Sequence, residues 1–195
     1  MSILLVAGSP SERSRSAALL DAVNYRLRGH GPEVERLQVR DLSPQALLLA
    51  DAAHRSVAAA VDQVARARAL VIATPVYKAA YSGVLKVFLD LLPQTAFKGK
   101  TVLPIATGGS PHHMLALDYA LRPVLQSLGA RHILPGVYAT DSQVTLTPEG
   151  AHHLAGDVSD RLDEAVAALV QEVQRDAPVA TVFRPVAFAD VRCSV

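Results

Sequence analysis

Short apolar runs that alternate with helical stretches constrain the fold of this chain more than any other feature. Ile3 to Ala7, Leu70 to Ala73 and Val102 to Ala106 are almost wholly apolar, and a Gly or a Thr follows each run. Runs of this length indicate strands that are buried on both faces. Because strands alternating with helices form parallel sheets, the chain is expected to build a sheet covered by helices on both sides.

Apolar residues at helical spacing complete this alternation. They predict helices over residues 14–28, 56–68, 82–92, 113–128 and 148–175. Two further strands are predicted over 34–39 and 133–138, the second interrupted by Pro135 and Gly136. The predicted fold class is α/β, a doubly wound five-stranded parallel sheet. We expect one domain over residues 1–177 and an irregular segment over 178–195.

Composition excludes several classes of protein. Half of the 195 residues are hydrophobic and the formal net charge is only +1, so the chain is not predominantly disordered. This charge also gives no electrostatic field of the kind that attracts nucleic acid. The apolar runs are too short for a membrane span. Cys193 is the single cysteine, so a disulfide-built secreted scaffold is excluded, and a cytoplasmic protein is expected. The paired histidines at 112–113 and 152–153 lack metal-ligand spacing, so no metal site is predicted.

Three loops should meet where ligands bind in doubly wound sheets, beyond the carboxyl ends of the strands. The first follows Ala7 and contains four serines and two arginines within nine residues. Hydroxyls, guanidinium groups and the amides of a helix N-terminus favour phosphate, and the candidate ligands are Ser9, Ser14, Arg15 and Ser16. The alternative is a capping serine with solvated arginines. The loop has neither the P-loop nor the dinucleotide glycine pattern, so a monophosphate fits best.

The second and third loops favour a flat ring. In the second, Tyr77 offers an aromatic surface and Lys78 a cation, whereas Ser82 is interpreted as a helix cap. In the third, two glycines would let backbone amides approach a ligand edge, although an ordinary strand-to-helix turn is the alternative. The candidate ring-binding residues are Pro75, Val76, Tyr77, Lys78, Thr107, Gly108, Gly109 and Ser110. A phosphate at one end and a ring at the other describe a mononucleotide such as FMN.

Several segments resemble one family. Gly8-Ser9-Pro10, residues 73–83 (ATPVYKAAYSG) and 106–109 (ATGG), followed by 115–125 (LALDYALRPVL) and 141–144 (DSQV), are similar to the NADPH-dependent FMN reductases of the SsuE type. These are the reductase components of two-component alkanesulfonate monooxygenases. The resemblance covers roughly residues 1–145. The wider flavin reductase pattern has an arginine where this chain has Ser11, so Arg13 or Arg15 would supply that charge.

The resemblance implies a flavodoxin-like fold, a homotetramer, and transfer of a hydride from NADPH to N5 of FMN. FMN would be a substrate or loosely bound, and the reduced flavin would leave for a flavin-dependent sulfonate monooxygenase of sulfur metabolism. Tyr119 falls where the family carries an inserted tyrosine that forms a π-helix at the tetramer interface. No side-chain nucleophile or general acid is demanded, so no catalytic residue is predicted. Lys78 could meet the phosphate of the pyridine nucleotide instead of the flavin.

Other functions use similar loops. A quinone or azo reductase with firmly bound FMN would need the same three loops and would ignore free FMN. A flavodoxin-type electron carrier without NADPH activity is usually strongly acidic, and the sequence pI near 8.0 argues against it. A regulatory flavin- or nucleotide-sensing protein would not oxidise NADPH at all.

Overall fold

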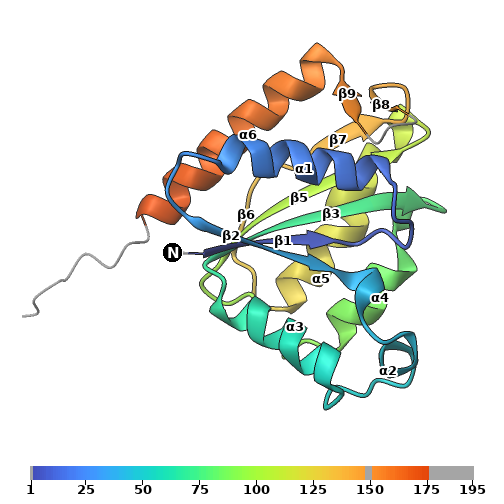
Figure 1. Cartoon of the computed structure of the whole chain (residues 1–195), viewed down its shortest axis with the longest axis vertical. Coiled ribbons are helices and arrows are strands. Elements are labelled where there is room, and N and C mark those ends of the chain that lie inside the picture. The colour runs from blue at the N-terminus through green and yellow to red at the C-terminus, as the bar shows by residue number, and fades with distance from the viewer. Residues whose placement is uncertain (1, 148–150, 176–195) are drawn as a thin grey trace, which may run out of the picture.

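A computed structural model of the protein describes residues 2–147 and 151–175. It contains a central parallel sheet with helices on both faces (Figure 1). The central strands are β1 (Ser2–Ala7), β3 (Ala69–Tyr77) and β5 (Thr101–Gly108), with β2 (Glu33–Gln38) at one edge. The spatial order is β2-β1-β3-β5-β6, and these pairs are parallel. The predicted five-stranded doubly wound sheet is confirmed.

The fifth strand is divided, as the proline and glycine in the sequence predict. β6 (His132–Ile133) and β7 (Val137–Thr140) both pair in parallel with β5, and Pro135 and Gly136 separate them. β5 therefore has the same neighbour along most of its length.

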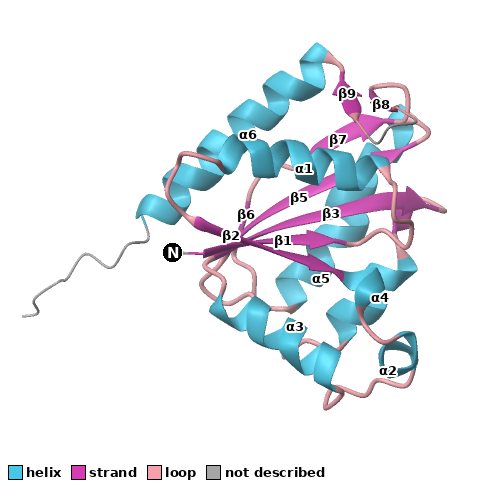
Figure 2. Cartoon of the chain, viewed as in Figure 1, coloured by secondary structure: helices cyan, strands magenta, loops and turns pink. Residues whose placement is uncertain are grey.

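Helices cover the two faces of the sheet and bury two separate apolar clusters (Figure 2). α1 (Arg15–Leu27) and α6 (Gly156–Arg175) lie together on one face, where Leu19, Val23 and Leu162 are fully buried. The opposite face carries α3 (Arg55–Arg66), α4 (Gly83–Asp90) and α5 (Arg122–Ser127). Burying both faces explains why β1, β3 and β5 are continuous apolar runs.

The predicted helix over 113–128 is three consecutive segments with different hydrogen bonding. A 3₁₀ helix over Pro111–Leu115 leads into a π-helix over Ala116–Leu121, and α5 follows. Tyr119 lies within the π-helix, with 79% of its surface exposed. The π-helix that the resemblance implied at this residue is therefore present.

The predicted helix over 148–175 begins too early. α6 starts at Gly156, and His152–Leu154 form strand β9, which pairs antiparallel with β8 (Val144–Leu146). Leu154 fits the helical spacing, but its side chain packs on the same core from this hairpin. A single apolar residue can be buried from a helix or from a strand, so the spacing of Leu154 does not distinguish the two. The segment predicted over 178–195 lies outside the described residues.

Three further small elements have no counterpart in the prediction. α2 (Pro44–Leu48) and the 3₁₀ turn Val39–Asp41 fill the connection from β2 to α3. β4 (Ala80–Tyr81) pairs antiparallel with the end of β3 and makes a hairpin there. This hairpin lies at the carboxyl edge of the sheet, where the ligand-binding loops are expected.

Candidate functional site

The three sequence segments singled out as loops do meet at the carboxyl edge of the sheet, but two of them begin as strand. β3 continues through Pro75, Val76 and Tyr77, and β5 continues through Thr107 and Gly108. The two strands pair with each other as far as Pro75 and Thr107, so both strands extend beyond the apolar runs from which they were predicted. Placing these residues in loops was wrong. The loops proper begin at Lys78 and Gly109.

The first loop ends at a capped helix with free donors. The Ser14 hydroxyl oxygen accepts a hydrogen bond from the Ala17 amide at 3.1 Å, and Ser14 Oγ lies 3.3 Å from Ser16 Oγ. The amides of Arg15 and Ser16 have no acceptor within the helix because they belong to its first turn. Capping thus accounts for Ser14, while these amides and the positive end of the helix dipole are suited to an anion.

Ser9 is also part of this loop and is almost fully buried, with 3% of its surface exposed. Its hydroxyl oxygen accepts a hydrogen bond from the Ser11 amide at 3.1 Å. That bond fixes the turn at the start of the loop and leaves the hydroxyl proton of Ser9 available to a ligand.

The two arginines of the loop bind a segment to which the sequence alone assigned no role. Arg15 Nε donates to the carbonyl oxygens of Asp141 and Val144, each at 3.1 Å, and its guanidinium lies 3.7 Å from the Asp141 carboxylate. Arg13 donates to the carbonyl oxygen of Thr147. The resemblance of residues 141–144 to the family was the available signal for this contact. Both arginines tie the first loop to the chain after β7.

A buried hydroxyl pair joins the first and second segments. Ser82 Oγ donates to the carbonyl of Gly8 and accepts from the Leu85 amide at 3.2 Å, which confirms its predicted role as the cap of α4. The Ser82 amide donates to Thr74 Oγ1 at 3.0 Å. Ser82 and Thr74 are both 1% exposed, so these bonds are shielded from water and hold the two segments at a fixed separation.

The β3–β4 hairpin contains backbone that ordinary residues avoid. Tyr77 pairs with Ala80, and the two residues between them, Lys78 and Ala79, have φ of 50° and 63°. Left-handed backbone costs a residue with a side chain about 1–2 kcal/mol, and such positions cluster at functional sites. The turn presents Lys78 and the half-exposed ring of Tyr77 at the carboxyl edge, while Pro75 and Val76 beneath are buried.

Gly108 lacks a side chain for a reason that the sequence did not reveal. A Cβ there would lie 2.6 Å from Tyr138 Oη and 3.2 Å from Val76 Cβ. Tyr138 Oη donates to the Ser110 carbonyl at 2.6 Å, so the tyrosine occupies the space that a side chain at 108 would need. Gly108 therefore serves internal packing. Gly109 is exposed, and a Cβ there would lie 3.8 Å from Asp141 Oδ2, at ordinary contact distance, so its backbone remains accessible to a ligand.

Burial is the main cause that raises the pKa of Tyr138, and the neighbouring Asp141 carboxylate raises it further. The hydrogen bond to Ser110 acts in the opposite direction and lowers it. The phenol therefore stays protonated at neutral pH and remains a donor to the third loop. Ser110 in turn caps the 3₁₀ helix, since its hydroxyl oxygen accepts from the His112 amide.

The edge as a whole fits a flavin mononucleotide. The open amides at the start of α1 and the Ser9 hydroxyl match a phosphate, and the exposed Tyr77 ring matches a flat aromatic partner. Among residues 2–147 and 151–175, no group of three or more His, Cys, Asp or Glu is placed to hold a metal ion. No described helix is long and apolar enough to cross a membrane.

The strand order and this edge define a protein of the flavodoxin-like class. An archaeal flavodoxin superposes with a TM-score of 0.60 at 12% identity, covering 89% of this chain and 99% of its own, which supports the fold alone. The family model for NADPH-dependent FMN reductases matches residues 1–145. The chain belongs to this family.

Individual relatives agree with that assignment. The chain is 44% identical to an FMN reductase (NADPH) of Escherichia coli over 178 residues, which is 90% of this chain and 91% of the relative. It is 45% identical to an FMN reductase (NADPH) of Pseudomonas putida, with 92% of each chain covered. The crystal structure of an apo NADH:FMN oxidoreductase, EmoB, has a TM-score of 0.78 at 41% identity and covers 87% of this chain and 88% of its own.

Proposed function

We propose that this protein takes a hydride from NADPH, delivers it to FMN, and releases the reduced flavin to a second enzyme. The observation that carries the proposal is that a helix terminus suited to an anion and a hairpin with an exposed aromatic ring meet at one edge of the sheet, in a member of a reductase family. FMN, when bound, supplies the ring that accepts the hydride. The chain's own residues have to bind, align and shield.

The roles of the phosphate-side residues are inferred from their positions. The amides of Arg15 and Ser16 and the Ser9 and Ser14 hydroxyls would hold the phosphate. Arg15 would do so with the guanidinium donors left over from its bonds to the segment after β7. Thr107 and Gly108 would act through their place in β5, which positions the third loop.

The ring would lie against the hairpin. Pro75 and Val76 would form its floor and Tyr77 its flank, while the backbone of Gly109 and Ser110 would face the pyrimidine edge. Lys78 offers a cation to a phosphate of either nucleotide. No group here has to donate or abstract a proton during hydride transfer, so we assign no catalytic residue.

We further propose that the acceptor of the reduced flavin is a flavin-dependent monooxygenase acting on alkanesulfonates, in sulfur metabolism. Support comes from the segments that resemble SsuE-type reductases. The single cysteine supports the accompanying proposal of a cytoplasmic location.

A homotetramer with Tyr119 near an interface is part of the same proposal. Tyr119 projects from the π-helix at 79% exposure, and Met114 and Leu115, just before it, are 56% and 53% exposed. Three large exposed apolar or aromatic side chains within six residues are typical of a surface that pairs with another chain. Sedimentation of the wild type and of Tyr119→Ala tests this, because loss of the ring should weaken the assembly. An unchanged tetramer, or a monomeric wild type, would contradict it.

The function is tested by NADPH oxidation in the presence and absence of free FMN. Saturable turnover that requires added FMN is the expected result. A protein that is purified with firmly bound FMN, reduces quinones and does not respond to added FMN would be a quinone reductase instead. Absence of turnover with any acceptor would overturn the assignment of an enzyme.

A further inference from the structure

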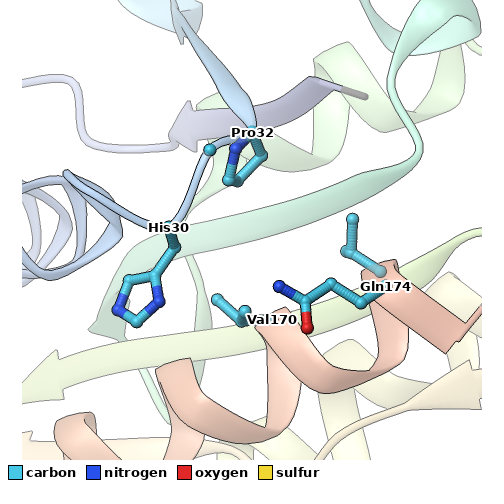
Figure 3. A pocket seen from close by; sticks show the side chains of 6 residues that line it. His30, Pro32, Val170 and Gln174 are labelled. Atoms are coloured by element: carbon cyan, nitrogen blue, oxygen red, sulfur yellow. The ribbon is translucent and has the colours of Figure 1, made fainter.

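A hollow of about 210 Å³ lies at the end of the sheet opposite the candidate site. Its walls are the connection from α1 to β2, at His30, Gly31 and Pro32, and the last turns of α6, at Val170, Val173 and Gln174. Figure 3 shows His30 and Pro32 on one side and Val170 and Gln174 on the other.

The hollow has an apolar floor and an open rim. Val170 and Val173 are 6% and 4% exposed and form the floor, whereas His30, Gly31 and Gln174 are exposed at the rim. A dry apolar cavity of about 150 Å³ is enough to bind benzene. The hollow therefore has room for one aromatic side chain.

The chain that continues from this place has the matching chemistry. α6 ends at Arg175, directly after Gln174, and residues 176–195 follow. More than half of these residues are apolar, their two Asp and two Arg cancel in charge, and they include Phe183 and Phe188. Segments that remain solvated are poor in such residues and carry net charge, so this composition favours contact with an apolar surface.

We propose that residues 178–188 fold back onto the hollow of their own subunit and place Phe183 in it. The reach is sufficient, because eight residues extend at most about 28 Å and Val170 lies only about 8 Å back along the helix from Arg175. Pro178 cannot continue α6, so the chain can leave the helix axis within three residues of Arg175. This inference is independent of the proposed reductase activity, because the hollow lies at the other end of the sheet.

Fluorescence tests the contact directly, since the chain contains no tryptophan. Phe183→Trp in the full chain supplies a single reporter, and Ser194→Trp is the matched control in the same segment, outside residues 178–188. Relative to the control, F183W should emit at shorter wavelength and show a roughly twofold or larger drop in acrylamide quenching, because the ring loses its exposed surface.

Variants of the rim then decide where the reporter lies. Pro32→Asp with Gln174→Asp places two carboxylates beside the hollow and should return F183W to the quenching of the control. Gln171→Asp, exposed one turn earlier on α6, should leave it protected. Circular dichroism verifies that each variant is folded.

Three results would overturn the proposal. They are equal quenching of F183W and S194W, protection that survives P32D/Q174D, and protection that disappears on dilution. The last would place the segment on a second copy of the chain.

Discussion

The contact between Gly108 and Tyr138 gives the most demanding prediction. Replacing Gly108 with alanine would put Cβ 2.6 Å from Tyr138 Oη, about 0.8 Å closer than the 3.4 Å at which ordinary contact begins. The tyrosine must move and lose its 2.6 Å hydrogen bond to the Ser110 carbonyl. Overpacking of this kind costs about 1–3 kcal/mol, and we expect G108A to lower the free energy of unfolding by about 2 kcal/mol.

Removing the phenolic oxygen should relieve most of that cost. Tyr138→Phe alone loses one hydrogen bond, worth about 1 kcal/mol. In its background the nearest ring atom to the new methyl group is Cζ at 3.5 Å, which is ordinary contact, and only Val76 Cβ at 3.2 Å stays tight. The double variant should therefore be more stable than the sum of the single changes predicts, by about 1–2 kcal/mol.

Urea denaturation followed by circular dichroism measures all four proteins of this cycle. A fully unfolded baseline and equal slopes are required for the comparison. If the two changes add to within about 0.5 kcal/mol, the packing explanation for Gly108 is refuted.

Three further predictions concern the site's framework. Ser82→Ala removes the cap of α4 and leaves the buried Gly8 carbonyl without its hydrogen bond, so it should lower the free energy of unfolding in urea by about 2 kcal/mol. Ser43→Ala removes a cap without that second bond and should lower the free energy of unfolding by about 1 kcal/mol, and equal losses would contradict this. Ala79→Gly relieves the left-handed backbone of the β3–β4 hairpin and should raise the free energy of unfolding by about 0.5–1 kcal/mol, whereas Ala165→Gly within α6 should lower it by a similar amount. A lower free energy of unfolding for both variants would argue against strain at the hairpin. The raised pKa of Tyr138 means that its stabilising effect is full below the ordinary value of about 10 and is lost as pH rises through the raised pKa. Y138F should remove one late-titrating phenol from the ultraviolet titration; an unchanged late phase would contradict it.

The sheet could be predicted from the sequence because its signals are local. Continuous apolar runs ending at Ala7, Ala73 and Ala106 specify central strands without reference to other parts of the chain. The division of the fifth strand could also be predicted, because Pro135 and Gly136 interrupt it within the sequence itself.

The features that could not be predicted depend on contacts between distant residues. The strand character of Pro75 and Thr107 comes from their pairing with each other, 32 positions apart. The need for glycine at 108 comes from Tyr138, and the anchoring of Arg15 comes from carbonyls after β7. Glycine and arginine in a loop are typical of ligand-binding sites. The tertiary structure decides which of them instead contact other parts of the protein.

The β8–β9 hairpin illustrates a different limit. Leu154 continues the apolar spacing of α6, and its core contact would be satisfied in helix or strand. Sequence periodicity identifies which residues are buried with more certainty than it identifies the element that buries them.

Counting reduced flavin under anaerobic conditions shows whether FMN is a substrate that leaves the protein after reduction. Purified protein is mixed with excess NADPH and a large molar excess of FMN, and the solution is then passed through a membrane that retains the protein. We expect reduced flavin far in molar excess of the protein in the filtrate. Reduction that stops at one flavin per subunit and stays with the retained protein would contradict it.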